Sequence, residues 1–85
     1  MIKLPVIPKG EDVFVHKLPN CPNCMVLMDK LNLAGVCYTQ MTMGEVDSRV
    51  ELAACNCFAV EAPVLQVGDK CYTFAELERR ARDLA

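Results

Sequence analysis

The sequence predicts an α/β protein with the element order β-α-β-α-β-β-α, in which a four-stranded mixed sheet has helices on both faces. Three observations predict this class. Hydrophobic residues make up 53% of the 85-residue chain, which is enough for a packed core. A strand, a helix and a second strand follow one another within about thirty residues, a spacing typical of two parallel strands joined by a crossover. A hairpin pattern then precedes a last amphipathic helix.

The whole chain, residues 1–85, is predicted to be a single domain, with residues 1–11 as an N-terminal extension. The net charge is −2 and no face collects Lys and Arg, which argues against nucleic-acid binding. The start, MIKLPVIP, lacks the features of a secretory signal, and no apolar run approaches the ~18 residues that span a bilayer. We therefore expect a cytoplasmic protein with no membrane partner, in which cysteines are free unless they do chemistry or bind metal.

The first strand is predicted at Asp12–His16, because the sequence DVFVH is rich in β-branched and aromatic residues. A loop at Lys17–Asn20 follows it. Pro22 suits the first position of a helix, where its missing N–H costs nothing, and Gly35 suits the position just after a helix end. Apolar side chains at helical spacing are expected to face the core: Met25, Leu27, Met28 and Leu31.

The middle of the chain is predicted to hold a strand and a short helix. The strand is expected at Val36–Met41, parallel to the first. Ser48–Glu51 has the spacing of a capping box, which predicts a helix start there. One face of this helix is expected to carry Val46, Val50 and Ala54.

The last part of the chain is predicted to form a hairpin followed by a helix. Pro63–Val67 is strand-like, Gly68–Asp69 is a two-residue turn, and Cys71–Thr73 is expected to pair back. Thr73–Glu76 is a second capping box and opens the last helix. The side chains expected to face inward from this helix are Phe74, Leu77, Ala81 and Leu84.

The motif Cys-Pro-Asn-Cys at Cys21–Cys24 is the strongest candidate for chemistry. If Pro22 is the first helical residue, Cys21 is the N-cap, and its sulfur lies beside unpaired N–H groups at the positive end of the helix. Such surroundings lower a thiol pKa from ~8.5 into the range ~3.5–7.5. We therefore predict that Cys21 is a nucleophile and that Cys24, one turn into the helix, resolves the mixed disulfide formed at Cys21.

The same spacing also occurs in metal sites. The alternative hypothesis is therefore a module or carrier that binds zinc, copper or an iron–sulfur cluster through Cys21 and Cys24, with or without Cys55 and Cys57. Zinc knuckles usually have Gly-rich loops, whereas here the pair opens a helix that follows a strand. This context favours the redox interpretation.

The other cysteines and the single histidine are given structural roles. Cys37 and Cys71 fall in predicted strands, where a buried thiol acts as a small hydrophobic side chain. Cys55 and Cys57 follow a helix and are predicted to fill the core, with a regulatory disulfide or metal binding as alternatives. His16 is expected to pack beneath the loop that leads to the cysteine pair.

Two segments, VFVHKLPNCPNCM and EAPVLQVGDKCYTFAEL, give the chain a family resemblance. Over residues 12–84 it resembles a small glutaredoxin, or a glutaredoxin-like redoxin, of the thioredoxin fold. The resemblance implies a thioredoxin-like (glutaredoxin-type) fold and a dithiol–disulfide oxidoreductase with Cys21 and Cys24 as catalytic residues. It also implies a cis Pro63 that lies against the pair, beside the incoming substrate.

The substrate-binding residues implied by the resemblance are Lys17, Pro22, Asn23, Ala62 and Pro63. Glutathione-using members carry a basic residue where this chain has Leu18, and a Gly-Gly-x-Asp-like turn where it has Tyr72–Glu76. The expected substrate is therefore a protein disulfide, with a mixed disulfide of glutathione as the alternative. The reductant is expected to be thioredoxin reductase or glutathione, and the protein is expected to act as a monomer without a bound cofactor.

Overall fold

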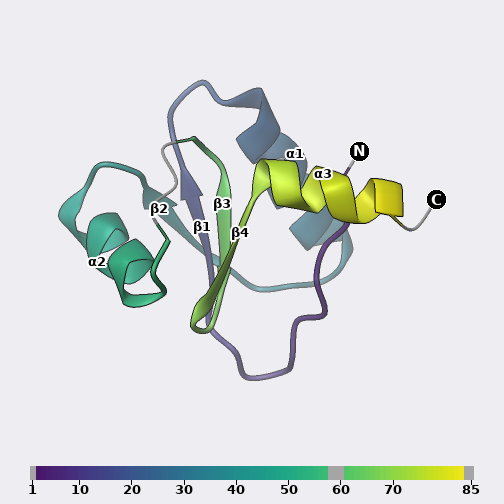
Figure 1. Ribbon diagram of the computed structural model, residues 1–85, viewed down its shortest axis with the longest axis horizontal. Coiled ribbons are helices and arrows are strands. Elements are labelled where there is room, and N and C mark those ends of the chain that lie inside the picture. The colour runs from purple at the N-terminus through teal and green to yellow at the C-terminus, as the bar shows by residue number, and fades with distance from the viewer. Residues whose placement is uncertain (1, 58–60, 84–85) are drawn as a thin grey trace.

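The computed structural model describes residues 2–57 and 61–83. Within these ranges, four strands and three helices follow the predicted order (Figure 1). The strands are β1 (Val13–Lys17), β2 (Thr39–Thr42), β3 (Val64–Val67) and β4 (Lys70–Thr73). The helices are α1 (Pro22–Leu33), α2 (Val46–Ala54) and α3 (Phe74–Asp83).

The strands form one mixed sheet in the order β2-β1-β3-β4. β1 runs parallel to β2, with Val15 opposite Gln40, and antiparallel to β3, with Val15 opposite Leu65. β3 and β4 form the predicted hairpin across a two-residue turn at Gly68 and Asp69. Gly68 has φ +59°, a backbone conformation that glycine adopts at no steric cost.

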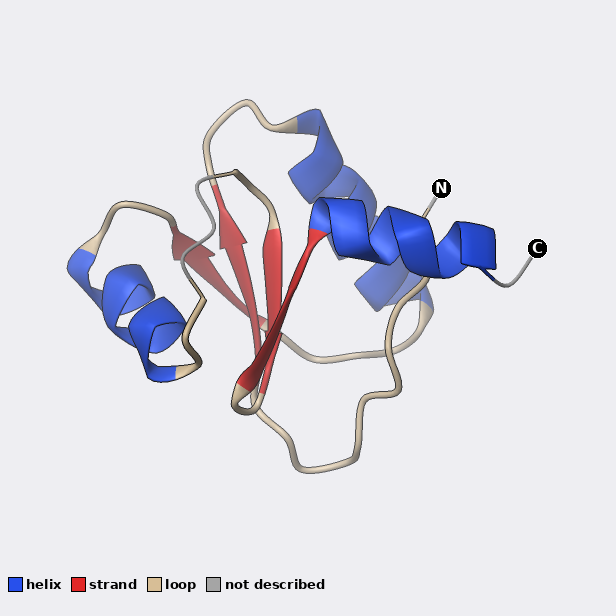
Figure 2. Ribbon diagram, viewed as in Figure 1, coloured by secondary structure: helices blue, strands red, loops and turns tan. Residues whose placement is uncertain are grey.

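Helices cover both faces of the sheet: α1 and α3 lie on one side and α2 on the other (Figure 2). Alternate residues of each strand face opposite sides, so the sheet supplies two apolar clusters. The larger cluster lies beneath α1 and α3 and consists of Ile2, Val13, Val15, Leu27, Leu31, Leu65, Val67 and Leu77. The smaller cluster lies beneath α2 and centres on Leu52, Cys57 and Val64.

The N-terminal segment packs into the larger cluster. Ile2 is 2% exposed, and the N–H of Lys3 donates to the carbonyl of Leu77 over 3.1 Å. Residues 2–11 contain no strand. The predicted extension is thus an irregular segment that contributes to the core.

α1 begins and ends where the sequence predicts. Pro22 is its first residue, and Gly35, with φ +71°, follows its C-cap. The expectation that Met25 faces the core is wrong, because this side chain is 63% exposed. The buried residues of α1 are Cys24, Leu27 and Leu31, whose spacing of three and four defines a stripe with its centre about 130° away from Met25 around the helix.

β2 begins at Thr39, three residues after the predicted start at Val36. The reason is the helix end: the N–H of Val36 donates to the carbonyl of Leu31 and still belongs to the C-terminal turn of α1. The prediction that Cys37 is buried in a strand is therefore wrong. Cys37 is exposed in the connection between α1 and β2.

α2 also differs from its prediction. It begins at Val46 with Glu45 as N-cap, so Ser48 lies inside the helix, is 1% exposed and does not cap it. Val46 and Val50, which were expected to share one face of the helix, are 70% and 61% exposed. The inward stripe is formed by Ser48 and Leu52, because a buried polar partner on β1 engages the Ser48 hydroxyl.

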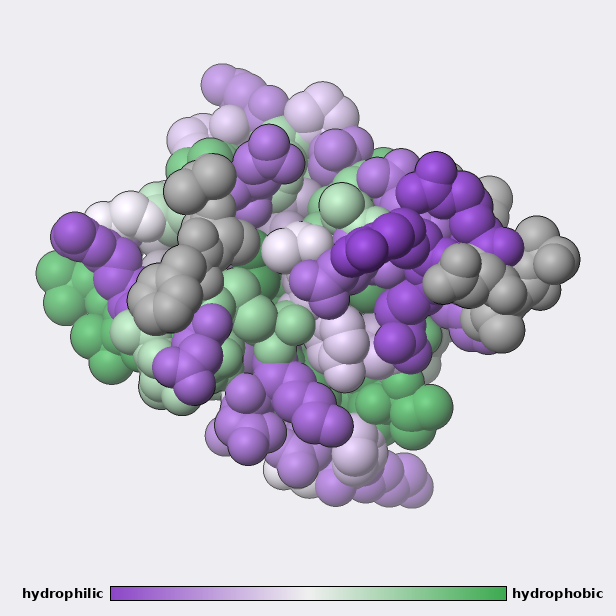
Figure 3. All heavy atoms as spheres, in the orientation of Figure 1, coloured by the Kyte–Doolittle hydropathy of each residue, from purple (hydrophilic) through white to green (hydrophobic). Residues whose placement is uncertain are grey.

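α3 follows its capping-box prediction. The Thr73 hydroxyl accepts a hydrogen bond from the N–H of Glu76 and donates to the Glu76 carboxylate. Leu77 is fully buried and Phe74 is half-buried, as predicted, while Leu84 lies outside the described residues. Hydrophilic side chains dominate the surface over α3, whereas hydrophobic surface appears beside α2, where Val46 and Val50 are exposed (Figure 3).

Candidate functional site

The cysteine pair lies where a loop turns from β1 into α1. Asn20, just before the pair, has φ +57°, a left-handed conformation that asparagine tolerates better than most residues. Cys21 is the N-cap of α1, with φ −107° and ψ 104°, and Pro22 takes the first helical position. The sequence therefore predicted this helix start correctly, down to the capping residue.

Cys21 and Cys24 form a disulfide, and their Cα atoms are 5.2 Å apart. The backbone N–H of Cys24 donates a hydrogen bond to Sγ of Cys21 over 3.1 Å. The two residues differ in exposure, since Cys24 is 2% exposed and Cys21 is half-buried. A reactant in solution can therefore approach Cys21, while Cys24 is shielded by the body of the protein.

A hollow of about 410 Å³ lies beside the pair, and we call it the disulfide hollow. Lys17 and Pro22, two of the predicted substrate-binding residues, line it together with both cysteines. The remaining lining residues are Leu18, Pro19, Asn20, Met25 and Met28. The exposed Met25 side chain thus borders the cysteine pair.

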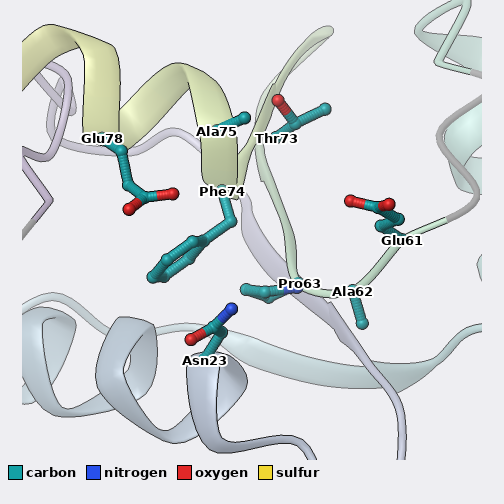
Figure 4. A pocket seen from close by; sticks show the side chains of 8 residues that line it. All are labelled: Asn23, Glu61, Ala62, Pro63, Thr73, Phe74, Ala75 and Glu78. Atoms are coloured by element: carbon teal, nitrogen blue, oxygen red, sulfur yellow. The ribbon is translucent and has the colours of Figure 1, made fainter.

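The other predicted substrate-binding residues meet in a second hollow of about 310 Å³, which we call the Pro63 hollow. Asn23, from the first turn of α1, faces Pro63 across it, and Ala62 lies beside Pro63 (Figure 4). The peptide bond between Ala62 and Pro63 is cis, as the resemblance implies. The further lining residues of the Pro63 hollow are Glu61, Thr73, Phe74, Ala75 and Glu78. The sequence did not predict a role at the site for either glutamate.

A buried polar network on the α2 side of the sheet was also not predicted. His16 is fully buried, with Nδ1 at 2.7 Å from Oγ of Ser48 and Nε2 at 2.7 Å from Oε1 of Gln66. The Gln66 amide nitrogen donates to the carbonyl of Gly68 and to the Glu51 carboxylate, so Oε1 of Gln66 faces His16 as an acceptor. His16 therefore packs among hydrogen-bond partners from α2 and β3.

Cys55, Cys57 and Cys71 gather in the smaller cluster beneath α2. Burial raises the pKa of the Cys71 thiol strongly, and hydrogen bonding to Cys57 adds to the effect. Burial also raises the pKa of the Cys55 thiol, against the lowering effect of its hydrogen bond with Cys71. These surroundings favour the protonated thiols of Cys55 and Cys71. Cys57 is buried, as its predicted core role requires.

The metal-binding hypothesis used Cys21 and Cys24, with or without Cys55 and Cys57, and the structure separates these two pairs. Cys21 and Cys24 open α1, whereas Cys55 and Cys57 lie beneath α2 on the opposite face of the sheet. Among the side chains that the structure describes, no three or more His, Cys, Asp or Glu residues are grouped so that they could hold a metal ion.

None of the helices in residues 2–57 and 61–83 has the length and hydropathy needed to cross a bilayer. No protein-family model matches the chain, and a search of curated proteins finds no match.

Proposed function

We propose that the protein is a dithiol–disulfide oxidoreductase in which Cys21 is the nucleophile and Cys24 the resolving thiol. The placement of the pair carries the proposal. Cys21 caps α1 and is half-buried, while Cys24 is buried one turn inside and donates its N–H to the Cys21 sulfur. One sulfur is thus open to a partner disulfide, and the other is held where it can attack only Cys21.

The surroundings of Cys21 favour a thiolate once the disulfide is reduced. The N–H of Cys24 donates toward the sulfur, and the first turn of α1 directs its partial positive charge to the same point. Both effects stabilise an anion more than a neutral thiol, so they lower a thiol pKa. The fraction of nucleophilic thiolate at neutral pH rises accordingly.

The reaction is two successive thiol–disulfide exchanges. The Cys21 thiolate attacks one sulfur of the substrate disulfide, which forms a mixed disulfide and releases the first substrate thiolate. Cys24, after losing its proton, attacks the Cys21 sulfur and releases the second substrate thiolate. The substrate gains two electrons and two protons, and the protein is left with the Cys21–Cys24 disulfide, which a reductant must reopen.

The arrangement supports a thioredoxin-like, glutaredoxin-type assignment. That resemblance brings the Cys21–Cys24 segment and the Ala62–Pro63 segment together at the substrate site. In the structure, Asn23 and Pro63 line one hollow although they are far apart in the sequence (Figure 4). The order β2-β1-β3-β4, with a helix on the opposite face from the other two, supports the same assignment.

The substrate that we propose is a protein disulfide. Its peptide would lie across the two hollows, with Lys17 and Pro22 on one side of the pair and Asn23, Ala62 and Pro63 on the other. The reductant would be thioredoxin reductase or glutathione, and the chemistry needs no bound cofactor because the two sulfurs carry the electrons. We place this activity in the cytoplasm, in a monomer of one domain.

Three variants test the proposal in an assay that couples reduction of a disulfide-bonded protein to dithiothreitol. Cys21→Ser should lose the catalysed rate, and Cys24→Ser should accumulate a covalent complex whose mass equals protein plus substrate. The matched control is Cys37→Ser, which removes an exposed cysteine outside the site and should keep full activity. Retention of activity by Cys21→Ser would show that the pair is not the reactive centre.

A further inference from the structure

The Pro63 hollow carries negative charge on two sides. Glu78 projects into it from α3 and Glu61 from the segment before β3, with Phe74 and Pro63 between them (Figure 4). The lining contains no Lys, Arg or His among the residues that the structure describes. Glutamate side chains ordinarily carry a negative charge, so the hollow presents two negative charges.

Basic groups near the hollow do not line it. Arg79 and Arg82 follow Glu78 on α3, but both are exposed to solvent. Lys17 lines the disulfide hollow instead. The charge that a ligand would meet within the Pro63 hollow is therefore negative.

The position of this hollow makes it part of the proposed substrate site. Asn23, which lies between the two reactive cysteines in the chain, forms one wall, and Pro63 forms another. A substrate whose sulfur reaches Cys21 would place its neighbouring residues near this wall. The half-buried Phe74 ring offers apolar surface for the stem of a long side chain whose charged head lies between the carboxylates.

Two carboxylates in a concave site act on any charged substrate that approaches it. Such sites raise the local concentration of opposite charges and can change association rates by about 10- to 1,000-fold. Groups of the same sign are repelled, and both effects weaken once the Debye length falls well below the ~8 Å of physiological salt. Glutathione disulfide, in which carboxylates outnumber ammonium groups, has the sign that this hollow repels.

We infer that Glu61 and Glu78 determine substrate charge: the protein selects disulfides of protein segments that carry Lys or Arg beside the reactive cysteine, and it disfavours anionic disulfides. This inference rests on the proposed oxidoreductase function and names the substrate class of the same site. Phe74 and the two carboxylates would hold the cationic side chain while Cys21 attacks the neighbouring sulfur.

The test compares three peptides that differ only in the residues flanking one cysteine, which are Lys, Gln or Glu. Each peptide is joined through a disulfide to 2-mercaptoethanol, and kcat/KM is measured with dithiothreitol as the terminal reductant. Rates with dithiothreitol alone correct for the intrinsic reactivity of each disulfide. The variants are Glu61→Gln/Glu78→Gln and, as a control with the same change in net charge, Glu45→Gln/Asp69→Asn, which lies outside both hollows.

At low salt, kcat/KM for the Lys peptide should exceed kcat/KM for the Glu peptide by at least about tenfold. This ratio should fall in 0.5 M salt, which screens the two carboxylates. Glu61→Gln/Glu78→Gln should bring the ratio of kcat/KM for the Lys peptide to that for the Glu peptide to within about threefold, and its circular dichroism spectrum should match that of the unmodified protein, which shows that the variant is folded. The control should keep the ratio. A ratio near one in the unmodified protein, or one unchanged by removing both carboxylates, would overturn the inference alone, whereas failure to reduce any peptide would overturn the proposed function with it.

Discussion

The Nδ1 atom of His16 lies 2.7 Å from the hydroxyl oxygen of Ser48 and thereby joins the end of β1 to α2. His16 is fully buried and Ser48 is 1% exposed. The other ring nitrogen of His16, Nε2, lies 2.7 Å from Oε1 of Gln66. Each partner satisfies a polar atom that would otherwise be buried without a hydrogen bond.

Ser48→Ala should therefore destabilise the protein. It leaves the Nδ1 atom of His16 buried without a partner, at a cost of about 1–3 kcal/mol in the free energy of unfolding. Urea unfolding followed by circular dichroism would measure the change, with the exposed neighbour Arg49→Ala as the control. Equal stability of Ser48→Ala and the unmodified protein would show that this hydrogen bond contributes nothing.

The start of α3 allows a second stability test. The Thr73 hydroxyl accepts the N–H of Glu76 over 3.2 Å, so Thr73→Ala leaves one helix N–H without its cap. The expected loss is about 1 kcal/mol in the free energy of unfolding. Thr73→Ser keeps the hydroxyl and should retain most of that stability. A Ser variant as unstable as the Ala variant would assign the effect to the lost methyl group.

Alkaline pH should lower the free energy of unfolding, and ionisation of the Cys71 thiol should contribute to this loss. Burial raises the pKa of this thiol above its ordinary value in the folded state. Well below the ~8.5 of an ordinary thiol, both the folded and the unfolded chain keep the proton; as pH rises through that value the unfolded chain loses the proton first, so the free energy of unfolding falls. Unfolding by urea at pH 8 and pH 10.5, with a reductant present, should show a smaller loss for Cys71→Ala than for the unmodified protein.

Cys37→Ala is the control for this pH effect, because Cys37 is exposed and lies outside the cluster beneath α2. It should lose as much stability between the two pH values as the unmodified protein. The same loss in Cys71→Ala would mean that burial of this thiol is not linked to unfolding.

Local signals in the sequence predicted the parts of the fold that depend on local chemistry. Pro22 and Gly35 mark the ends of α1, and Thr73 with Glu76 marks the start of α3, because each acts on backbone groups within one turn. The element order and the cap at Cys21 followed from such signals. These features are also the ones that position the reactive pair.

Predictions from the sequence were wrong or absent where contacts between distant parts of the chain determine the structure. Ser48 resembles a helix cap by its spacing, but its hydroxyl contacts His16, which is 32 residues earlier in the chain. The residues around Cys37 in the sequence are typical of a strand. The C-terminal turn of α1 nevertheless includes Val36, so β2 begins only at Thr39. Glu61 and Glu78 carry no motif, so only the folded chain brings them to one hollow.

The most direct test of the account measures the ionisation of Cys21 in the reduced state. The Cys24→Ser variant keeps the backbone N–H at position 24, and mass spectrometry of the peptide 18–30 after short iodoacetamide treatment would follow labelling at Cys21 alone. We expect the rate to reach half its maximum at a pH within about 3.5–7.5, because the helix end and this N–H stabilise the thiolate. A half-maximum near the ~8.5 of an ordinary thiol would contradict the account.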